Sequence, residues 1–186
     1  MKFIETIKVT GQLKIRVLDT KTKRVLRVIE TPNLICVGML EALQRLLTFY
    51  PEADWEAGGY GTVPKEERIW AIYAGDDATT PVYTNTDLNN TLFKKRCDGI
   101  IAKTGMEINV GGETGLLECQ MTMEGGEGND SPNPVYKEAG VFGRGDDNDP
   151  ASTTGARLLA HQIHASVEKD TSISIEYTWR IRITAS

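Results

Sequence analysis

The segment 172–184, SISIEYTWRIRIT, alternates apolar and polar side chains without interruption. Successive side chains of an extended strand point to opposite faces, so the segment predicts one strand with an apolar row and a polar row. The apolar row consists of Ile173, Ile175, Tyr177, Trp179, Ile181 and Ile183. At about 3.3 Å per residue this strand extends over roughly 40 Å, enough to cross a whole sheet. A chain that contains it must provide a sheet with one buried face.

The polar row of the same strand is expected to lie on the outside. It consists of Ser174, Glu176, Thr178, Arg180 and Arg182. Because burial of charged groups without partners is costly, Arg180 and Arg182 are predicted to face solvent or a partner protein, and both are candidate interface residues. The side chains predicted to lie in the core are Ile175, Tyr177, Trp179 and Ile181.

Two other patterns predict a hairpin and a helix in the first third of the chain. Residues 13–17 alternate apolar and polar, residues 19–23 are polar, and residues 25–29 are again rich in apolar side chains. This succession is typical of a β hairpin. Leucines then recur at intervals of three and four over residues 40–47, which predicts a helix that ends near Pro51.

The remaining apolar segments predict a fold that is mainly β. They lie at residues 68–75, 92–103, 106–110, 116–124 and 156–168, and Gly, Pro or Asn residues separate them. About eight strands and one helix favour an antiparallel β sandwich with the helix packed at its end. We assign residues 1–34 to an amino-terminal arm and hairpin and residues 35–186 to the sandwich domain with its helix, together one globular unit. Residues 1–12 are predicted to be an arm that adds a strand to a neighbour's sheet.

Composition and charge restrict the classes of partner. The 186 residues are 40% hydrophobic and 25% charged, which is ordinary for a folded domain, and the net charge is −5. A negative chain has no electrostatic reason to bind phosphate backbones, so we expect no nucleic-acid partner. No apolar run approaches the roughly 20 residues that span a bilayer, and the amino terminus lacks the apolar region of a signal peptide. We therefore expect no membrane association and synthesis in a cytoplasm.

The motifs of enzymes and metal sites are not recognisable in the sequence. Cys36, Cys97 and Cys119 are widely spaced and are expected to be reduced core thiols. His161 and His164 lie three residues apart, which in a strand places them on opposite faces and argues against a shared metal ion. The acidic segment 146–149 remains open as a calcium-binding loop or a solvated surface loop. We predict no enzyme activity, no catalytic or metal-binding residue and no cofactor.

The order of several short segments resembles a family of tailed-bacteriophage virion structural proteins. The resemblance begins with a hairpin and the Asn33-Leu34-Ile35 run leading into a helix, followed by IWAIYAGDDATTP and TDLNNTL. It continues with a Glu-x-Gly-Val-Phe turn at residues 138–142, the strand that starts at residues 158–161, and Lys169 before the terminal strand with Trp179. His161 stands where the family more often has Arg, and residues 143–155 form a longer acidic loop than usual.

This resemblance implies a structural component of a phage tail, neck collar or baseplate. Such a protein is made in the host cytoplasm, resides in the virion, and assembles with other phage structural proteins, here expected as a homo-oligomeric ring. Polar loops are suited to subunit contacts, because their side chains are not needed in a core. The candidate interface residues outside the terminal strand are Trp55, Tyr60, Asp146, Asp147 and Asp149.

A second class of function remains open beside assembly. A ligand-binding β sandwich, such as a carbohydrate- or receptor-binding module, would expose aromatic side chains to its ligand. Trp55 and Tyr60 are the clustered candidates.

Two residues of the predicted 138–142 turn are expected to have structural roles. Gly140 is predicted to allow a close approach or a positive φ that a Cβ atom would oppose. Phe142 is predicted to fill the core.

Overall fold

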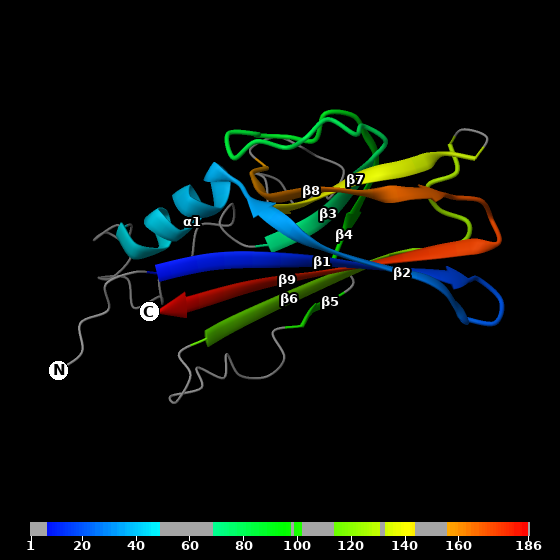
Figure 1. The fold of residues 1–186 in the computed structure, drawn as a ribbon, viewed down its shortest axis with the longest axis horizontal. Coiled ribbons are helices and arrows are strands. Elements are labelled where there is room, and N and C mark those ends of the chain that lie inside the picture. The colour runs from blue at the N-terminus through cyan, green and yellow to red at the C-terminus, as the bar shows by residue number, and fades with distance from the viewer. Residues whose placement is uncertain are drawn as a thin grey trace, which may run out of the picture.

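The fold is described from a computed structural model, which defines residues 7–48, 69–97, 99–101, 114–130, 133–143 and 156–185. These ranges contain nine strands and one helix (Figure 1). The elements are β1 (Ile7–Asp19), β2 (Val25–Ile35), α1 (Val37–Thr48), β3 (Ile69–Gly75), β4 (Thr91–Arg96), β5 (Gly99–Ile101), β6 (Thr114–Met123), β7 (Val135–Gly143), β8 (Leu158–Glu168) and β9 (Ile173–Ala185). The prediction of a mainly β fold with one helix is confirmed.

All neighbouring strands pair antiparallel in one sheet of order β4-β3-β7-β8-β2-β1-β9-β6-β5. The sheet curls over its own core (Figure 1), and β2 connects the two halves because it pairs with β1 and, at Leu34 and Ile35, with β8. At the open seam the Lys95 ammonium on β4 donates to the Thr122 carbonyl on β6, at 2.7 Å. Two separate sheets, as a sandwich requires, are not confirmed, since the halves are continuous through β2.

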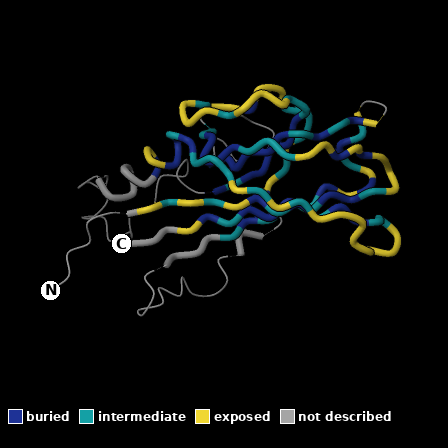
Figure 2. The backbone as a smooth tube through the Cα atoms, viewed as in Figure 1, coloured by how far each residue is buried: buried dark blue, intermediate teal, exposed yellow. Residues whose placement is uncertain are grey.

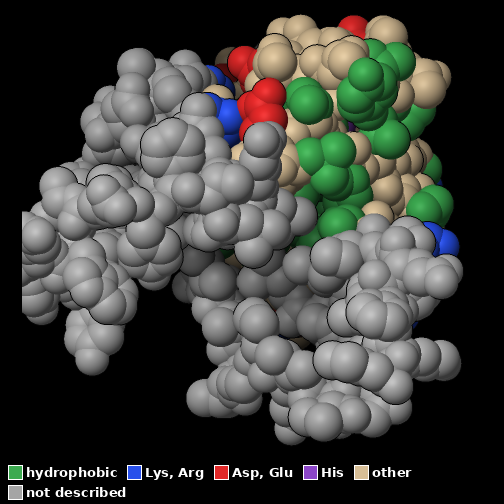
Figure 3. Space-filling model, turned by 90° about the vertical axis from the view of Figure 1, so that its left-hand side faces the viewer, with side chains coloured by type: hydrophobic (Ala, Val, Ile, Leu, Met, Phe, Trp, Pro, Cys, Tyr) green, Lys and Arg blue, Asp and Glu red, His purple; other side chains and the backbone are tan. Residues whose placement is uncertain are grey.

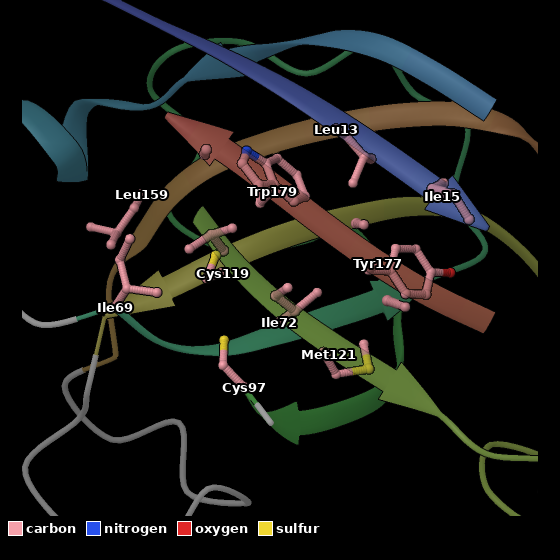
Figure 4. Packing of buried hydrophobic residues seen from close by; sticks show 14 of the residues in the cluster. Leu13, Ile15, Ile69, Ile72, Cys97, Cys119, Met121, Leu159, Tyr177 and Trp179 are labelled. Carbon is pink, nitrogen blue, oxygen red and sulfur yellow. The ribbon is translucent and has the colours of Figure 1, made fainter. Parts of the chain in front are cut away.

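The main core lies between the two halves of the curled sheet (Figure 2). Leu13 and Ile15 of β1 lie opposite Trp179 and Tyr177 of β9 in the strand register, and all four are buried. Cys119 and Met121 of β6 lie opposite Trp179 and Tyr177 and project from the same face of the sheet, and Figure 4 shows this group facing Ile72 of β3 across the core. Ile175 and Ile181 are also buried, so the inner row of β9 follows the alternation of its sequence.

The β1–β2 hairpin is confirmed, and its turn is held by Asp19. The Asp19 carboxylate accepts the backbone N–H groups of Lys21 and Thr22 and the Thr22 hydroxyl. These bonds, above all the one from the Thr22 N–H, lower the pKa of Asp19 below its ordinary value of 3.8. Lys23 takes a positive φ of 56°, which completes the turn.

The predicted amino-terminal arm is wrong for residues 7–12. These residues pair with β9 of the same chain, from Ile7 opposite Ala185 to Gln12 opposite Arg180. The reason is the length of β9: its 13 residues offer hydrogen bonds to a partner of equal length, and β1 uses all of them. Residues 1–6 lie outside the described part of the chain, as does the predicted strand at 106–110.

The helix lies where the leucine spacing predicts it. α1 begins directly after β2, and its Met39 and Ala42 are buried against the main core. The Glu41 carboxylate forms an ion pair with Arg157, which precedes β8.

Residues 138–142 were predicted to form a turn, and this prediction is wrong. They belong to β7, which pairs with β3 on one side and β8 on the other. Gly140 has no positive φ, but its position is tightly packed: a Cβ atom would lie 2.7 Å from Leu158 Cδ1, 2.9 Å from Leu88 Cδ2 and 3.2 Å from the Ala160 carbonyl, so these neighbours would have to shift. The close approach is therefore found in a strand, where glycine marks tight packing against the sheet.

Phe142 is buried outside the main core, in a second group that we call the outer cluster. The outer cluster consists of Cys36, Ala71, Tyr73, Leu88, Phe142 and Leu158. Phe142 stacks on Tyr73 with ring centroids 4.0 Å apart. Leu88 belongs to the β3–β4 loop, residues 76–90, so this loop supplies part of the cover of the outer cluster.

Candidate functional site

One face of the β2-β1-β9-β6 part of the sheet carries charged side chains on neighbouring strands, and we call it the polar face. The inner rows of β1 and β9 are buried, so their intervening residues point the other way, together with the residues opposite them on β2 and β6. The polar face consists of Lys8, Thr10, Gln12, Lys14 and Arg16 of β1, Glu176, Thr178, Arg180 and Arg182 of β9, Glu118, Gln120 and Thr122 of β6, and Val28, Glu30 and Pro32 of β2. It is the outer counterpart of the apolar row that builds the core. Ser174 and Thr178 of β9 are buried, so the prediction that the polar row of this strand lies outside is wrong for these two residues.

Three ion pairs connect neighbouring strands across the polar face. Lys14 Nζ lies 2.8 Å from Glu30 Oε1, and Arg16 Nη1 lies 3.0 Å from Glu176 Oε1. Arg180 Nε donates to Glu118 Oε2 at 2.7 Å. The hydrogen bond and positive charge of Lys14 lower the pKa of Glu30. Water reaches the basic member of each pair and weakens the attraction, so the main effect of the pairs is to orient the side chains.

A hollow of about 110 Å³ lies at one end of the polar face, between β1 and β9. Thr10, Gly11, Gln12, Arg180 and Arg182 line it. In the register Thr10 lies opposite Arg182 and Gln12 opposite Arg180, whereas Gly11 contributes only backbone. The structure thus brings together the two arginines that the sequence identifies as interface candidates. Hydroxyl, amide and guanidinium groups all donate hydrogen bonds, so the hollow is suited to an anion.

A second exposed surface lies at the end of the molecule that carries α1. Leu40, Val82 and Tyr83 are 53%, 55% and 61% exposed. The Val37 N–H at the start of α1 donates to the Tyr83 carbonyl at 2.7 Å, which holds the β3–β4 loop against the helix. Hydrophobic side chains gather on this end of the surface (Figure 3). We call these three residues the apolar patch; the sequence pattern did not reveal it, because two of them lie in a loop.

The β3–β4 loop is anchored by a buried acid that sequence reasoning missed. Glu138 and His161 are fully buried, and His161 Nε2 lies 2.9 Å from Glu138 Oε2. Glu138 also accepts the backbone N–H groups of Asn90 at 2.9 Å and Asn89 at 3.4 Å. A buried carboxylate needs such partners, since an unpaired one is strongly destabilising. Glu138 therefore fixes the loop that presents Val82 and Tyr83.

Lys169 holds a second loop in the same way. Its ammonium group donates to the carbonyls of Gly125 and Asp170, at 3.1 and 2.9 Å, and to Asn129 Oδ1 at 3.3 Å. Burial lowers the pKa of Lys169. All three donors are in use, so this lysine anchors the segment between β6 and β7 and has no donor left for a ligand.

The histidines and cysteines have structural environments. The His161 ring contacts Glu138, whereas the His164 ring packs edge-on against Tyr177, with centroids 5.9 Å apart. All three cysteines are buried and free. A side-chain hydrogen bond between the Cys119 and Cys97 thiols, together with burial, raises the pKa of Cys119. In the described ranges no group of three or more His, Cys, Asp or Glu side chains could hold a metal ion.

The other predicted interface residues lie outside the described part of the chain. They are Trp55, Tyr60, Asp146, Asp147 and Asp149. Of the described helices, none is long and apolar enough to cross a membrane. Comparison with known proteins found no similar protein family, no similar curated protein and no similar solved structure.

Proposed function

We propose that this chain is a structural component of a tailed-bacteriophage particle, in the tail, collar or baseplate, and that it acts by assembling with other virion proteins. The proposal starts from the resemblance carried by the Asn33-Leu34-Ile35 run, the 138–142 segment and the terminal strand with Trp179. In this view the two halves of the sheet serve as the layers of a β sandwich that holds the interaction surfaces in place.

The polar face is the observation that supports assembly best. It extends along strands of 10 to 13 residues, and it remains exposed at Thr10, Gln12 and Arg182. Rigid strands and oriented ion pairs make a surface whose side chains are already placed before a partner arrives, which reduces the entropy lost on binding. A broad, rigid, polar surface suits a protein partner better than a small molecule, which needs an enclosed pocket.

A homo-oligomeric ring is the arrangement that we favour. A ring repeats a head-to-tail contact, in which one surface of each subunit meets a different surface of the next. The polar face and the apolar patch are two different exposed surfaces on one subunit, and each would contact a complementary surface of a neighbour. The apolar patch would contribute buried apolar area, and the polar face would define the orientation of the subunits.

The test is the protein content of purified particles. Quantitative mass spectrometry of particles should find the chain at a fixed copy number relative to the other virion proteins. Sedimentation of the purified protein should show a defined oligomer whose population increases with concentration. Absence from particles, or recovery only in traces, would overturn the proposal.

Removal of residues 2–6 tests the part of the predicted arm that lies before β1. The variant should fold, because β1 remains complete, and its incorporation into particles should decrease if the arm contacts a neighbour. Serine at positions 146, 147 and 149 tests the acidic loop in the same assay. Wild-type incorporation of both variants would leave the polar face and the apolar patch as the contacting surfaces.

A further inference from the structure

We propose that the hollow between β1 and β9 binds a carboxylate side chain of a neighbouring protein subunit, with Arg182 as the main contact and Arg180 as the second. The proposal deepens the assembly function and depends on it for the identity of the partner. Its chemistry, a guanidinium pair that binds a carboxylate, is testable without particles.

The strand register creates the hollow. Arg180 and Arg182 are two residues apart on β9, so they project from the same face. Thr10 and Gln12 lie opposite them on β1 and also project from this face. Gly11 between them belongs to the inner row, and the Asn33 side chain occupies the space where its Cβ would lie. The floor of the hollow is therefore backbone, and its walls are hydrogen-bond donors.

Charge is unbalanced at this end of the polar face. Lys14, Arg16 and Arg180 each have an acidic partner on the neighbouring strand. Arg182 is exposed and forms no ion pair with any residue in the described ranges. The polar face holds five basic and three acidic side chains, so it is a basic surface on a chain whose net charge is −5. Arg182 is therefore the side chain at the hollow that would gain the most favourable interaction, a charge-assisted hydrogen bond, from a bound anion.

Arg180 is positioned for a second contact. Its Nε donates to Glu118, which fixes the plane of the guanidinium. The Nη donors are not used in that bond, and a planar guanidinium can bind two anions along two of its edges. The Arg180 side chain is therefore already ordered in the free protein, and it loses little further conformational entropy when a ligand binds.

A carboxylate fits better than the phosphates of a nucleic acid. A nucleic-acid backbone needs a track of several basic side chains, and here Glu30, Glu118 and Glu176 lie along the rest of the face. These three acids would repel a continuous polyanion, whereas a single carboxylate at Arg182 approaches only Glu118, whose charge Arg180 already balances. The partner is thus an acidic segment of a protein subunit.

The experiment is an NMR titration of the full chain with a short peptide that has blocked termini and carries a single glutamate. The arginine Nε–Hε resonances of residues 180 and 182 should shift on binding, and the dissociation constant is obtained from the titration. Arg182→Gln should weaken binding about tenfold, and Arg180→Gln should weaken it by a smaller factor. Arg24→Gln is the matched control, because Arg24 is exposed at the far end of the hairpin; it should change binding less than twofold.

The outcomes separate the two proposals. If the peptide shifts neither arginine, or if the Arg182→Gln and Arg24→Gln variants bind equally well, the hollow is not a carboxylate site, whatever the particle composition. If a 12-base-pair DNA duplex binds through Arg182 more tightly than the peptide at equal salt, the ligand is phosphate and the proposal fails. If the peptide binds as expected while the chain is absent from particles, the site stands and the virion function fails.

Discussion

Two kinds of ionic group occur in this protein, and they differ in exposure rather than in chemistry. Glu118 lies on the polar face, paired with Arg180 in contact with water. Glu138 is fully buried, accepts two backbone N–H groups and contacts His161. Water reaches the Glu118–Arg180 pair, mainly at Arg180, which is 42% exposed whereas Glu118 is 15% exposed, so less free energy depends on the pairing than in a fully buried site. Glu138 has no contact with water, so loss of any of its hydrogen-bond partners would leave a buried polar atom unsatisfied and destabilise the fold.

The difference in burial indicates which residues can bind a partner protein without being needed for stability. Removal of Glu138 would release the β3–β4 loop and, with it, Val82 and Tyr83. Removal of a residue on the polar face should leave the fold intact and alter only what binds there. Substitutions on the two kinds of region should thus separate stability from assembly.

The largest effect is expected for Trp179→Ala, which removes a fully buried ring from the inner row of β9. The loss of apolar contact and the cavity should reduce the free energy of unfolding by about 3 to 5 kcal/mol. Arg180→Gln, the next residue on the opposite face, should cost less than about 1 kcal/mol. Urea unfolding of both variants measures the difference, and similar stabilities would mean that the two faces of β9 are assigned incorrectly.

Glu138→Ala should be the next most destabilising change, by roughly 3 kcal/mol. It leaves the N–H groups of Asn89 and Asn90 and the His161 ring without their buried acceptor. Glu118→Ala makes the same chemical change on the polar face and should cost less than about 1 kcal/mol. Chemical denaturation compares the pair, and hydrogen exchange at Asn90 should increase only in the Glu138 variant. Equal costs would show that burial does not distinguish these acids.

Gly140→Val should destabilise the fold by about 1 to 3 kcal/mol through overpacking. The new side chain collides with Leu158 and Leu88, whose methyl groups lie within 3 Å of the Cβ position. Gly126→Val is the control, because a Cβ atom there meets nothing within 4 Å. The difference in melting temperature between the variants is the measurement. A Gly140→Val protein as stable as the control would contradict the close packing of β7.

The smallest expected effect is on how the stability of the fold depends on pH under acidic conditions. The pKa of Asp19 is lowered in the folded state, so its bonds stabilise the hairpin turn above the ordinary pKa of 3.8. This contribution is lost as the pH falls through the lower, folded-state pKa. NMR titration of the carboxylate should therefore give a midpoint below 3.8, and Asp19→Asn should make stability less sensitive to pH in that range. A midpoint at or above 3.8 would disprove the turn bonds.

Local sequence patterns correctly predicted the elements whose structure depends mainly on residues that are close in sequence. The alternation in β9, the polar turn of the hairpin and the leucine spacing of α1 each depend on neighbours in sequence, and all three correspond to elements of the structure. The 138–142 segment was predicted as a turn from its resemblance to the phage family, whereas here Gly140 lies within a strand and packs closely against Leu88 and Leu158. The contact comes from distant residues, so no local pattern reveals it.

The sequence predicts the shared position of the two arginines of the hollow, but it does not predict which residues lie beside them. Alternation alone places Arg180 and Arg182 on one face of a strand. Their neighbours Thr10 and Gln12 are about 170 residues away in the chain, and only the pairing of β1 with β9 brings them together. The apolar patch likewise depends on a loop held by Glu138, which is 55 residues beyond Tyr83.

The sequence by itself therefore determined the mainly β fold, the two faces of β9, the hairpin and the helix, because side-chain direction along a strand or helix has a fixed period. The tertiary structure alone decided that β1 pairs within its own chain, that β2 joins both halves of the sheet, and that Glu138, His161 and Lys169 are buried. Strand pairing and burial are set by competition among distant segments for the same hydrogen bonds and the same apolar contacts. That competition is resolved only when the whole chain has folded.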